Sequence, residues 1–459
     1  MQNVFHYSDP NVIANIIMET LNEIIDTLAP LKIVPIKKDF IPYIDAETRN
    51  LIRINKTQLT SAISSKHDKA KWRIYRKHRN KIFKSISKKK SAFIRGKLAK
   101  PIDKWKFVKT MTSNSVQSSP SYINLNGYTF QSPKIISNLM KDFYMNKIKD
   151  IRSGFSTPKV DPISILKHIS PACSTVFKIP FISVDETRKL ILSQKNSAST
   201  GYDSISNKII RKIAPEIAPI IAHLINSIIR TGIFPDCLKI SKVIPILKSG
   251  KEATSIESYR PVNCLPCIEK LAEEWIKLNL VNYFESNNLI NPNHHGERKG
   301  FSTVSAKSTI ENILHKNFKD NMITGVLNFD LSSCFETIDH KILGQKLEFY
   351  GVKGPELKLL KSYLSNWQQF VEIDTFRSRL VINLPTSCIQ GSKLSGILFT
   401  IYTLEVPLVQ KIMKNGILFQ NLTGLELPKL GQPKHETNTY IDYSFNTIGF
   451  EPKSKACQL

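Results

Sequence analysis

The chain has 459 residues, 41% of them hydrophobic, so it is long enough for two or three substructures and apolar enough to exclude wholesale disorder. Its 65 Lys and Arg against 38 Asp and Glu give a net charge of +27, which indicates a polyanionic partner, most commonly nucleic acid. Seven scattered cysteines form no disulfide framework, and neither a signal-peptide pattern nor an apolar run of about 18 residues occurs. We therefore expect an intracellular protein of the nucleus or cytoplasm, neither secreted nor bound to a membrane.

Residues 1–110 are expected to form a helical, basic N-terminal region. Its first part, residues 11–28, carries Ile and Leu at helical spacing, and Pro30 ends the run. This pattern predicts an amphipathic helix that packs against another part of the chain.

The run from Lys66 to Lys109 has 18 Lys or Arg and only two acidic residues. Aromatic and aliphatic residues recur in it at helical spacing, which predicts a long basic amphipathic helix. A solvated helix face is the plainer interpretation. The density of cations and the scarcity of acids favour a nucleic-acid-binding surface that contacts phosphates. Its predicted contact residues are Lys71, Arg73, Arg76, Lys77, Arg79, Lys81 and Lys84.

Residues 111–180, rich in Ser, Thr and Pro, are expected to be a connector carrying short elements. The sequence Ser183-Val-Asp-Glu186 is a capping box, so a helix should begin there. Further helices follow through Arg230, with isoleucines facing inward, and residues 232–235 close them.

Two short strands with basic residues at their ends come next. One runs from Lys242 into Lys248, and the other begins at Tyr259-Arg260-Pro. Either cation alone is an ordinary surface charge. Together they are suited to clamp a triphosphate, Lys248 as a mobile point charge and Arg260 as a bidentate fork.

Two pairs of residues resemble metal ligands but are interpreted otherwise. Cys264 and Cys267 have the spacing of half a zinc site, yet no second Cys or His pair lies at zinc-finger distance, so we interpret them as packing residues. Adjacent His294 and His295 would point to opposite sides of a strand, which argues against a shared metal.

Residues 325–329 read as a short buried strand that ends on Asp330. A carboxylate at the end of a core strand requires a cation, such as a metal, an arginine or a charged substrate. A solvated turn residue or a helix N-cap is the alternative for a lone Asp. Neighbouring motifs at suitable distances would favour the first interpretation.

The dodecamer from Phe329 to His340, Phe-Asp-Leu-Ser-Ser-Cys-Phe-Glu-Thr-Ile-Asp-His, resembles the first palm motif of reverse transcriptases from LTR-lacking (LINE-type) retrotransposons. Four further motifs, in the same order as in the family, also resemble it. The first combines Pro245-Ile-Leu-Lys248 with Tyr259-Arg-Pro-Val262, and the second is Gly296-Glu-Arg-Lys-Gly-Phe-Ser-Thr303. The third is Gln390-Gly-Ser-Lys-Leu-Ser-Gly-Ile-Leu-Phe399, and the fourth is Tyr440-Ile-Asp-Tyr443. The resemblance covers roughly residues 65–445.

The resemblance implies an RNA-directed DNA polymerase that extends a DNA primer on an RNA template with deoxynucleoside triphosphates, using two Mg2+ ions, which Mn2+ can replace. It makes Asp330 and Asp442 the catalytic carboxylates, and Asp330, Leu331 and Asp442 the metal ligands. It gives nucleotide-binding roles to Lys248, Arg260, Phe335, Gln390 and Gly391. Phe335 would lie under the sugar and exclude a 2'-hydroxyl, although packing alone also explains a Phe there. Other proteins of the element are further expected partners.

Several positions depart from the family pattern. Tyr443 replaces the second carboxylate beside Asp442, which should weaken metal binding. Glu297 stands where the family has Phe, which we expect to loosen that turn, and Gly396 replaces a Pro. The chain also ends where further palm elements and a thumb are expected, so we interpret it as a truncated polymerase with impaired synthesis. The alternative is a catalytically dead nucleic-acid-binding remnant.

The expected fold class is α/β (α+β), a right-hand polymerase with fingers, a ferredoxin-like palm, a basic helical N-terminal region and no thumb. The expected divisions are residues 1–110 (N-terminal region), 111–180 (connector), 181–310 (fingers-like part) and 311–459 (incomplete palm). A structural protein unrelated to polymerases would require five ordered motifs to coincide by accident.

Overall fold

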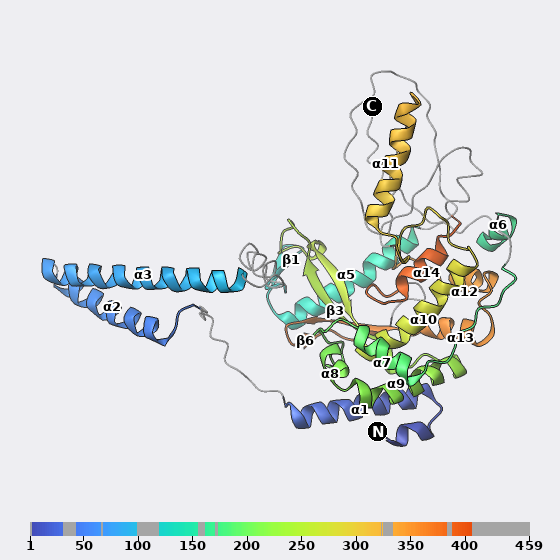
Figure 1. Ribbon diagram of the computed structural model, residues 1–459, viewed down its shortest axis with the longest axis horizontal. Coiled ribbons are helices and arrows are strands. Elements are labelled where there is room, and N and C mark those ends of the chain that lie inside the picture. Colours follow the sequence, from blue (N-terminus) through green and yellow to red (C-terminus); the bar gives the residue numbers. More distant parts are fainter. Residues whose placement is uncertain are drawn as a thin grey trace. The chain divides into compact units, whose positions relative to one another are not determined.

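The computed structural model describes residues 2–30, 43–65, 68–98, 119–154, 161–169, 173–322, 324, 334–382 and 388–405 (Figure 1). Contacts divide the chain into two compact units, residues 30–117 and a larger unit formed by residues 1–29 with 118–459. Residues 1–29, which we grouped with the basic region, therefore belong to the larger unit.

The smaller unit contains a hairpin of two helices, α2 (Ala46–Ser64) and α3 (Lys69–Leu98), which pack along each other. Ile82 of α3 is buried in this contact. Asp45 accepts the Thr48 amide at the start of α2 and pairs with Lys89 of α3 at 2.6 Å. The hydrogen bond from Lys89 is the main cause of the lowered pKa of the Asp45 carboxyl. The predicted long basic helix is confirmed over residues 69–98, and residues 99–109 lie outside the described ranges.

The larger unit begins with η1 (Gln2–His6) and α1 (Pro10–Leu28), which packs against α9 (Ala214–Thr231). Ile13, Ile17 and Leu21 of α1 are buried, as the helical spacing predicts, whereas Leu28 at its end is 79% exposed. The predicted N-terminal helix is therefore confirmed.

The larger unit contains a five-stranded sheet. Its strands are β3 (Ile240–Leu247), β4 (Tyr259–Cys264), β5 (Gln368–Ile373), β6 (Phe376–Arg377) and β7 (Val381–Ile382). The order is β4-β3-β5-β6, with β7 also paired to β5. β3 is antiparallel to β4 and parallel to β5, although β5 follows it by well over a hundred residues.

The helix α5 (Pro133–Ser153) packs against β5. Ile136, Met140 and Tyr144 of α5 share a hydrophobic cluster with Val243 of β3 and Val371 of β5. A small two-stranded sheet of β1 (Ile123–Leu125) and β2 (Tyr128–Phe130) precedes this helix, and α6 (Pro162–Ile169) follows it. The prediction that residues 111–180 form a connector with short elements was therefore wrong for this helix, which is 21 residues long and contributes to a core.

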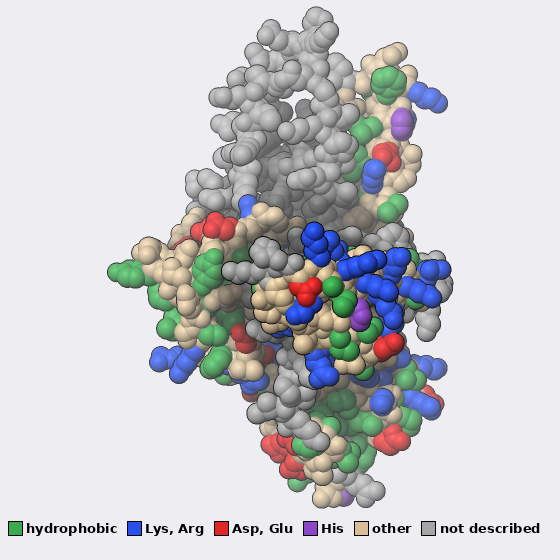
Figure 2. Space-filling view, turned by 90° about the vertical axis from the view of Figure 1, so that its left-hand side faces the viewer, with side chains coloured by type: hydrophobic (Ala, Val, Ile, Leu, Met, Phe, Trp, Pro, Cys, Tyr) green, Lys and Arg blue, Asp and Glu red, His purple; other side chains and the backbone are tan. Residues whose placement is uncertain are grey.

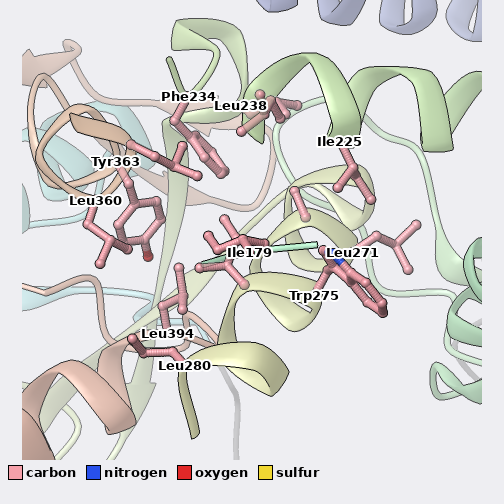
Figure 3. Close-up of a cluster of buried hydrophobic side chains, with 14 of the residues drawn as sticks. Ile179, Ile225, Phe234, Leu238, Leu271, Trp275, Leu280, Leu360, Tyr363 and Leu394 are labelled. Atoms are coloured by element: carbon pink, nitrogen blue, oxygen red, sulfur yellow. The ribbon is translucent and has the colours of Figure 1, made fainter. Parts of the chain in front are cut away.

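The main core is a bundle of helices with the large cluster shown in Figure 3. Tyr363, Phe234 and Trp275 supply its largest side chains there. The remaining elements are α7 (Val184–Ser193), α8 (Asn207–Lys212), η2 (Asp236–Leu238), η3 (Ile256–Ser258), α10 (Cys267–Ser286), α11 (Thr303–Lys319), α12 (His340–Phe349), α13 (Gly354–Leu364) and α14 (Ser395–Tyr402). The predicted capping box at Ser183 is confirmed, because its side chain accepts the Glu186 amide and Glu186 bonds back.

The fold class is mixed α and β, as predicted. The division into fingers and palm stays a prediction, and the strand expected at residues 325–329 lies outside the described ranges. Within the described residues, no helix is both long enough and apolar enough to cross a lipid bilayer.

Candidate active site

The three predicted metal ligands, Asp330, Leu331 and Asp442, lie outside the described residues, as does Tyr443. They stay predictions. The five predicted nucleotide-binding residues are all described, and the structure shows how four chain segments bring them toward one another.

Lys248 and Arg260 lie at the same end of the β3–β4 hairpin. In the antiparallel register Ile246 pairs with Arg260, and the Lys248 amide donates to the Ser258 carbonyl at 2.8 Å. The Lys248 ammonium donates to the Glu257 carbonyl at 2.7 Å. Strand pairing therefore fixes the two predicted phosphate-binding cations as close neighbours.

A third cation, Lys147 on α5, belongs to this group and was not predicted. Desolvation is the first cause of the lowered pKa of Lys248, and the positive charges of Lys147, Arg260 and Lys251 lower it further. Lys147 also lies close enough to Glu336 to oppose the rise in the pKa of Glu336 that burial causes. The contact of α5 with the sheet is long-range in sequence, so no local pattern signalled this position for Lys147.

The Gln390–Gly391 turn lies against β4. Gly391 has a φ of 101°, and a Cβ atom there would lie 3.0 Å from the carbonyl oxygen of Asn263. Asn263 follows Arg260 by three residues on the same strand, which is about 10 Å along it. A glycine at this position therefore lets the turn approach the strand that carries Arg260.

Phe335 reaches the same turn from another segment. Its carbonyl accepts the Cys388 amide at 2.7 Å, and its half-buried ring packs on Phe399 of α14, with ring centroids 5.4 Å apart. Gln390 itself is exposed. The backbone thus brings Phe335 beside the turn that carries Gln390, while its packing against Phe399 agrees equally with a core role.

Asp339 belongs to the same motif as Asp330, and it has a structural role. Its side chain accepts the Lys341 amide at 2.8 Å and the Ile342 amide at 3.1 Å, so it is the N-cap of α12. Arg152 of α5 lies 3.9 Å from the Asp339 carboxylate. Through Lys147 and Arg152, the C-terminal half of α5 therefore faces residues 334–339.

The residues that resembled metal ligands pack or bond within the protein. Cys267 is buried at the start of α10, and burial raises the pKa of its thiol. Buried His294 bonds to the Thr400 hydroxyl at 3.0 Å, and His295 bonds to the Ser305 hydroxyl at 2.9 Å. Among the described residues, no group of three or more His, Cys, Asp or Glu is arranged to hold a metal.

The seven predicted nucleic-acid contacts on α3 are all exposed. Residues one or two turns apart, such as Arg73, Lys77 and Lys84, fall on the side of the helix opposite buried Ile82. Figure 2, viewed from the side of the hairpin, shows Lys and Arg side chains gathered on it. Of the α3 cations whose side chains the structure describes, Lys89 alone makes an ion pair with another described residue, and its partners are Asp45 and Glu47. The seven predicted contact residues are therefore exposed to a polyanion in solution.

Known proteins resemble the part of the chain that carries this site. Residues 246–418 match the family of reverse transcriptase (RNA-dependent DNA polymerase). This match includes every predicted nucleotide-binding residue and Asp330, but it ends before Asp442.

Relatives in flies resemble about half of the chain. The RNA-directed DNA polymerase from mobile element jockey of Drosophila funebris is 26% identical over 227 residues, 49% of this chain and 24% of that protein. The probable RNA-directed DNA polymerase from transposon BS of Drosophila melanogaster is 28% identical over 227 residues, 49% of this chain and 25% of that protein. The chain thus spans about a quarter of the length of these curated relatives. Over residues 246–418 the chain is similar to reverse transcriptases, and over about half of its length it is similar to the RNA-directed DNA polymerases of the mobile elements jockey and BS.

Proposed function

We propose that this chain is an RNA-directed DNA polymerase of a retrotransposon, which adds deoxynucleotides to a DNA primer on an RNA template. The observation that carries the proposal is the approach of Gly391 to Asn263, because it sets the Gln390–Gly391 turn against the strand that holds Arg260. A nucleotide held by that turn has its phosphates within reach of a cationic cluster. Other proteins of the same element are further proposed partners, in the nucleus or the cytoplasm.

Each residue around the nucleotide has a role that its chemistry supports. Arg260 binds phosphate oxygens in a bidentate manner, and Lys248 supplies a mobile charge. The lowered pKa of Lys248 results from desolvation and from neighbouring cations, so a bound triphosphate would relieve the repulsion among these cations. Phe335 packs beside the sugar and disfavours a ribonucleotide.

The proposed metal ions are two Mg2+. The carboxylates of Asp330 and Asp442 would hold them, together with the backbone carbonyl of Leu331. Carboxylate oxygens are the hard donors that Mg2+ prefers, so this donor set fits the metal. Mg2+ bound there would neutralise charge on the triphosphate and favour ionisation of the primer hydroxyl. Tyr443, a neutral phenol beside Asp442, supplies one carboxylate fewer, and we propose that it impairs synthesis.

Primer extension by the purified full chain tests this proposal, with an RNA template, a DNA primer, deoxynucleoside triphosphates and Mg2+. Asp330→Ala should reduce extension to background, and Tyr443→Asp should raise it. Asp185→Ala, which changes an exposed residue on α7, is the control and should leave extension unchanged. Extension that survives Asp330→Ala would contradict the proposal.

A second function, nucleic-acid binding by the helical hairpin without synthesis, is favoured by the exposed cations of α3. A chain with this function alone would bind RNA and DNA about equally, with or without nucleotide. Asp330→Ala would leave that binding unchanged. Binding measured by fluorescence anisotropy in the same preparations that are assayed for extension therefore separates the two functions.

A further inference from the structure

Glu273 is a buried carboxylate on α10 whose hydrogen-bond partners come from two other segments. The Tyr363 hydroxyl of α13 donates to its Oε1 atom at 2.5 Å, and the Ser392 hydroxyl donates to the same atom at 2.5 Å. The Lys393 backbone amide donates to Oε2 at 2.7 Å. Both oxygens of one side chain are therefore occupied by donors, and two of the three belong to residues that directly follow the Gln390–Gly391 turn.

The bonds continue from Ser392 into the next helix. The Ser392 hydroxyl accepts the Leu394 amide at 3.0 Å and the Ser395 amide at 3.2 Å. The Ser395 hydroxyl donates back to the Ile389 carbonyl at 2.7 Å, on the other side of the turn. Figure 3 shows Tyr363 and Leu394 in the hydrophobic cluster that surrounds this network.

The packing makes this network a rigid support. Tyr363 is 1% exposed and its ring contacts Phe234 and Trp367, so its hydroxyl has little freedom to follow the turn if the turn moves. Hydrogen bonds to a buried charged group are stronger than neutral ones, and an unmet buried partner is costly. The position of the turn is therefore determined by the carboxylate beneath it.

We propose that Glu273 is a positioning residue, which holds the Gln390–Gly391 turn in the position in which the turn can contact an incoming nucleotide. Glu273 acts through Ser392 and Lys393 and does not touch the nucleotide itself. This inference rests on the proposed polymerase function and deepens it, because it assigns the geometry of the nucleotide-binding turn to a residue in the core of α10.

Steady-state primer extension with varied deoxynucleotide concentration tests the proposal in the full chain. Glu273→Gln replaces one acceptor oxygen by an amide donor, so at least one of the three donors loses its acceptor. We expect a rise of about tenfold in KM for the deoxynucleotide, with kcat changed by less than about threefold. A general loss of folded protein would lower the apparent kcat and leave KM unchanged, so this split identifies positioning.

Two further variants keep the test decisive if Glu273→Gln does not fold. Tyr363→Phe removes one donor and keeps the carboxylate, so it should raise KM for the deoxynucleotide by a smaller factor. Ser392→Ala removes a donor to Glu273 and the acceptor of the Leu394 and Ser395 amides, and it should also raise KM. Asn282→Ala is the control, because Asn282 is an exposed residue of the same helix α10. It should change KM less than twofold.

Amide hydrogen exchange separates failure of this inference from failure of the proposed function. The amides of residues 393–395 should exchange slowly in the wild-type chain and at least tenfold faster in Glu273→Gln or Tyr363→Phe. If the wild-type chain does not extend primers but the variants still exchange faster, the proposed polymerase function is rejected. The inference that Glu273 supports the turn is then retained. Unchanged exchange, or an unchanged KM in a chain that extends primers, would overturn the inference.

Discussion

Glu269 is a carboxyl that the core of α10 buries completely. In the described part of the chain, neither of its oxygens has a hydrogen-bond partner of good geometry, and Glu273 lies one turn away. Burial raises the pKa of Glu269 well above its ordinary value of 4.5, and the charge of Glu273 raises it further against the opposing effect of Lys270. Glu269 is therefore protonated at pH values where the same residue in the unfolded chain is ionised, which opposes folding.

Glu269→Gln should make the protein more stable than the wild type as the pH rises. Between 4.5 and the raised pKa of Glu269, the folded wild-type chain holds a proton that the unfolded chain releases, so the free energy of unfolding falls with pH. The variant lacks this penalty, and its advantage should grow by up to about 1.4 kcal/mol per pH unit. Urea unfolding from pH 5 to 8 measures this difference. Exposed Glu19→Gln on α1 should show no such trend, and parallel pH profiles for Glu269→Gln and the wild type would exclude the effect.

Lys147 should contribute to nucleotide binding through its charge. It lies in the electrostatic environment of Lys248 together with Arg260, so Lys147→Gln removes one of the cations that a triphosphate would meet. We expect nucleotide affinity to fall about threefold to tenfold at low salt, with a smaller loss at high salt, because ions screen an exposed charge. Lys149→Gln on another face of α5 is the control. Equal effects of the two changes would show that only net charge matters.

At the scale of elements, two departures from the family pattern lie in contact. A Cβ atom at Gly396 of α14 would lie 2.5 Å from Cγ and Cδ of Glu297, so the Glu297 side chain occupies the space that a larger residue at 396 requires. Glu297 also pairs with Lys277 of α10 at 2.5 Å. We expected Glu297 to loosen its turn, but the ion pair with Lys277 holds this turn in place. The absence of a side chain at Gly396 leaves space for the Glu297 side chain.

A double-mutant cycle measures this compensation. Gly396→Ala should destabilise the protein by about 1 to 3 kcal/mol, because the new methyl group overlaps Glu297. In a Glu297→Ala background the same change should cost little, giving a coupling free energy of about 1 kcal/mol or more. Gly344→Ala on α12 is the control, since its Cβ would meet only the flexible end of Lys361 at 3.3 Å. Additive free energies in thermal melts would show that the two sites are independent.

The sequence predicted elements whose signals are local. The capping box at Ser183, the end of α9 at Gly232 and the two strands that flank Lys248 all follow from residues within a few positions of each other. The helix α5 was missed although Ile136, Met140 and Tyr144 recur at helical spacing, because residues 111–180 were interpreted from their content of Ser, Thr and Pro. The contact between Glu297 and Gly396 and the position of Lys147 near Lys248 both join segments that are far apart in the sequence. A local sequence pattern therefore cannot predict them.

For the whole molecule, the charge excess predicts salt-sensitive binding through one face of α3. Replacing Arg73, Lys77 and Lys84 by Gln should weaken RNA and DNA binding alike. The slope of log K against log salt concentration should become shallower by about 0.7 to 0.9 for each phosphate that the variant no longer neutralises. Lys89→Gln is the matched control on the same helix, because Lys89 pairs with Asp45 and should affect the stability of the hairpin more than the slope. A slope unchanged by the triple variant would exclude this face.

The parallel pairing of β3 with β5 has a consequence for synthesis of the chain. β3 pairs with β4 soon after both emerge from the ribosome, but its other edge stays open until β5 has been made, well over a hundred residues later. At typical translation rates that interval is on the order of ten seconds, during which an unpaired strand edge is exposed to aggregation. Lys242 and Pro245 within β3 lessen that danger, since a charge and a missing amide both discourage pairing with foreign strands.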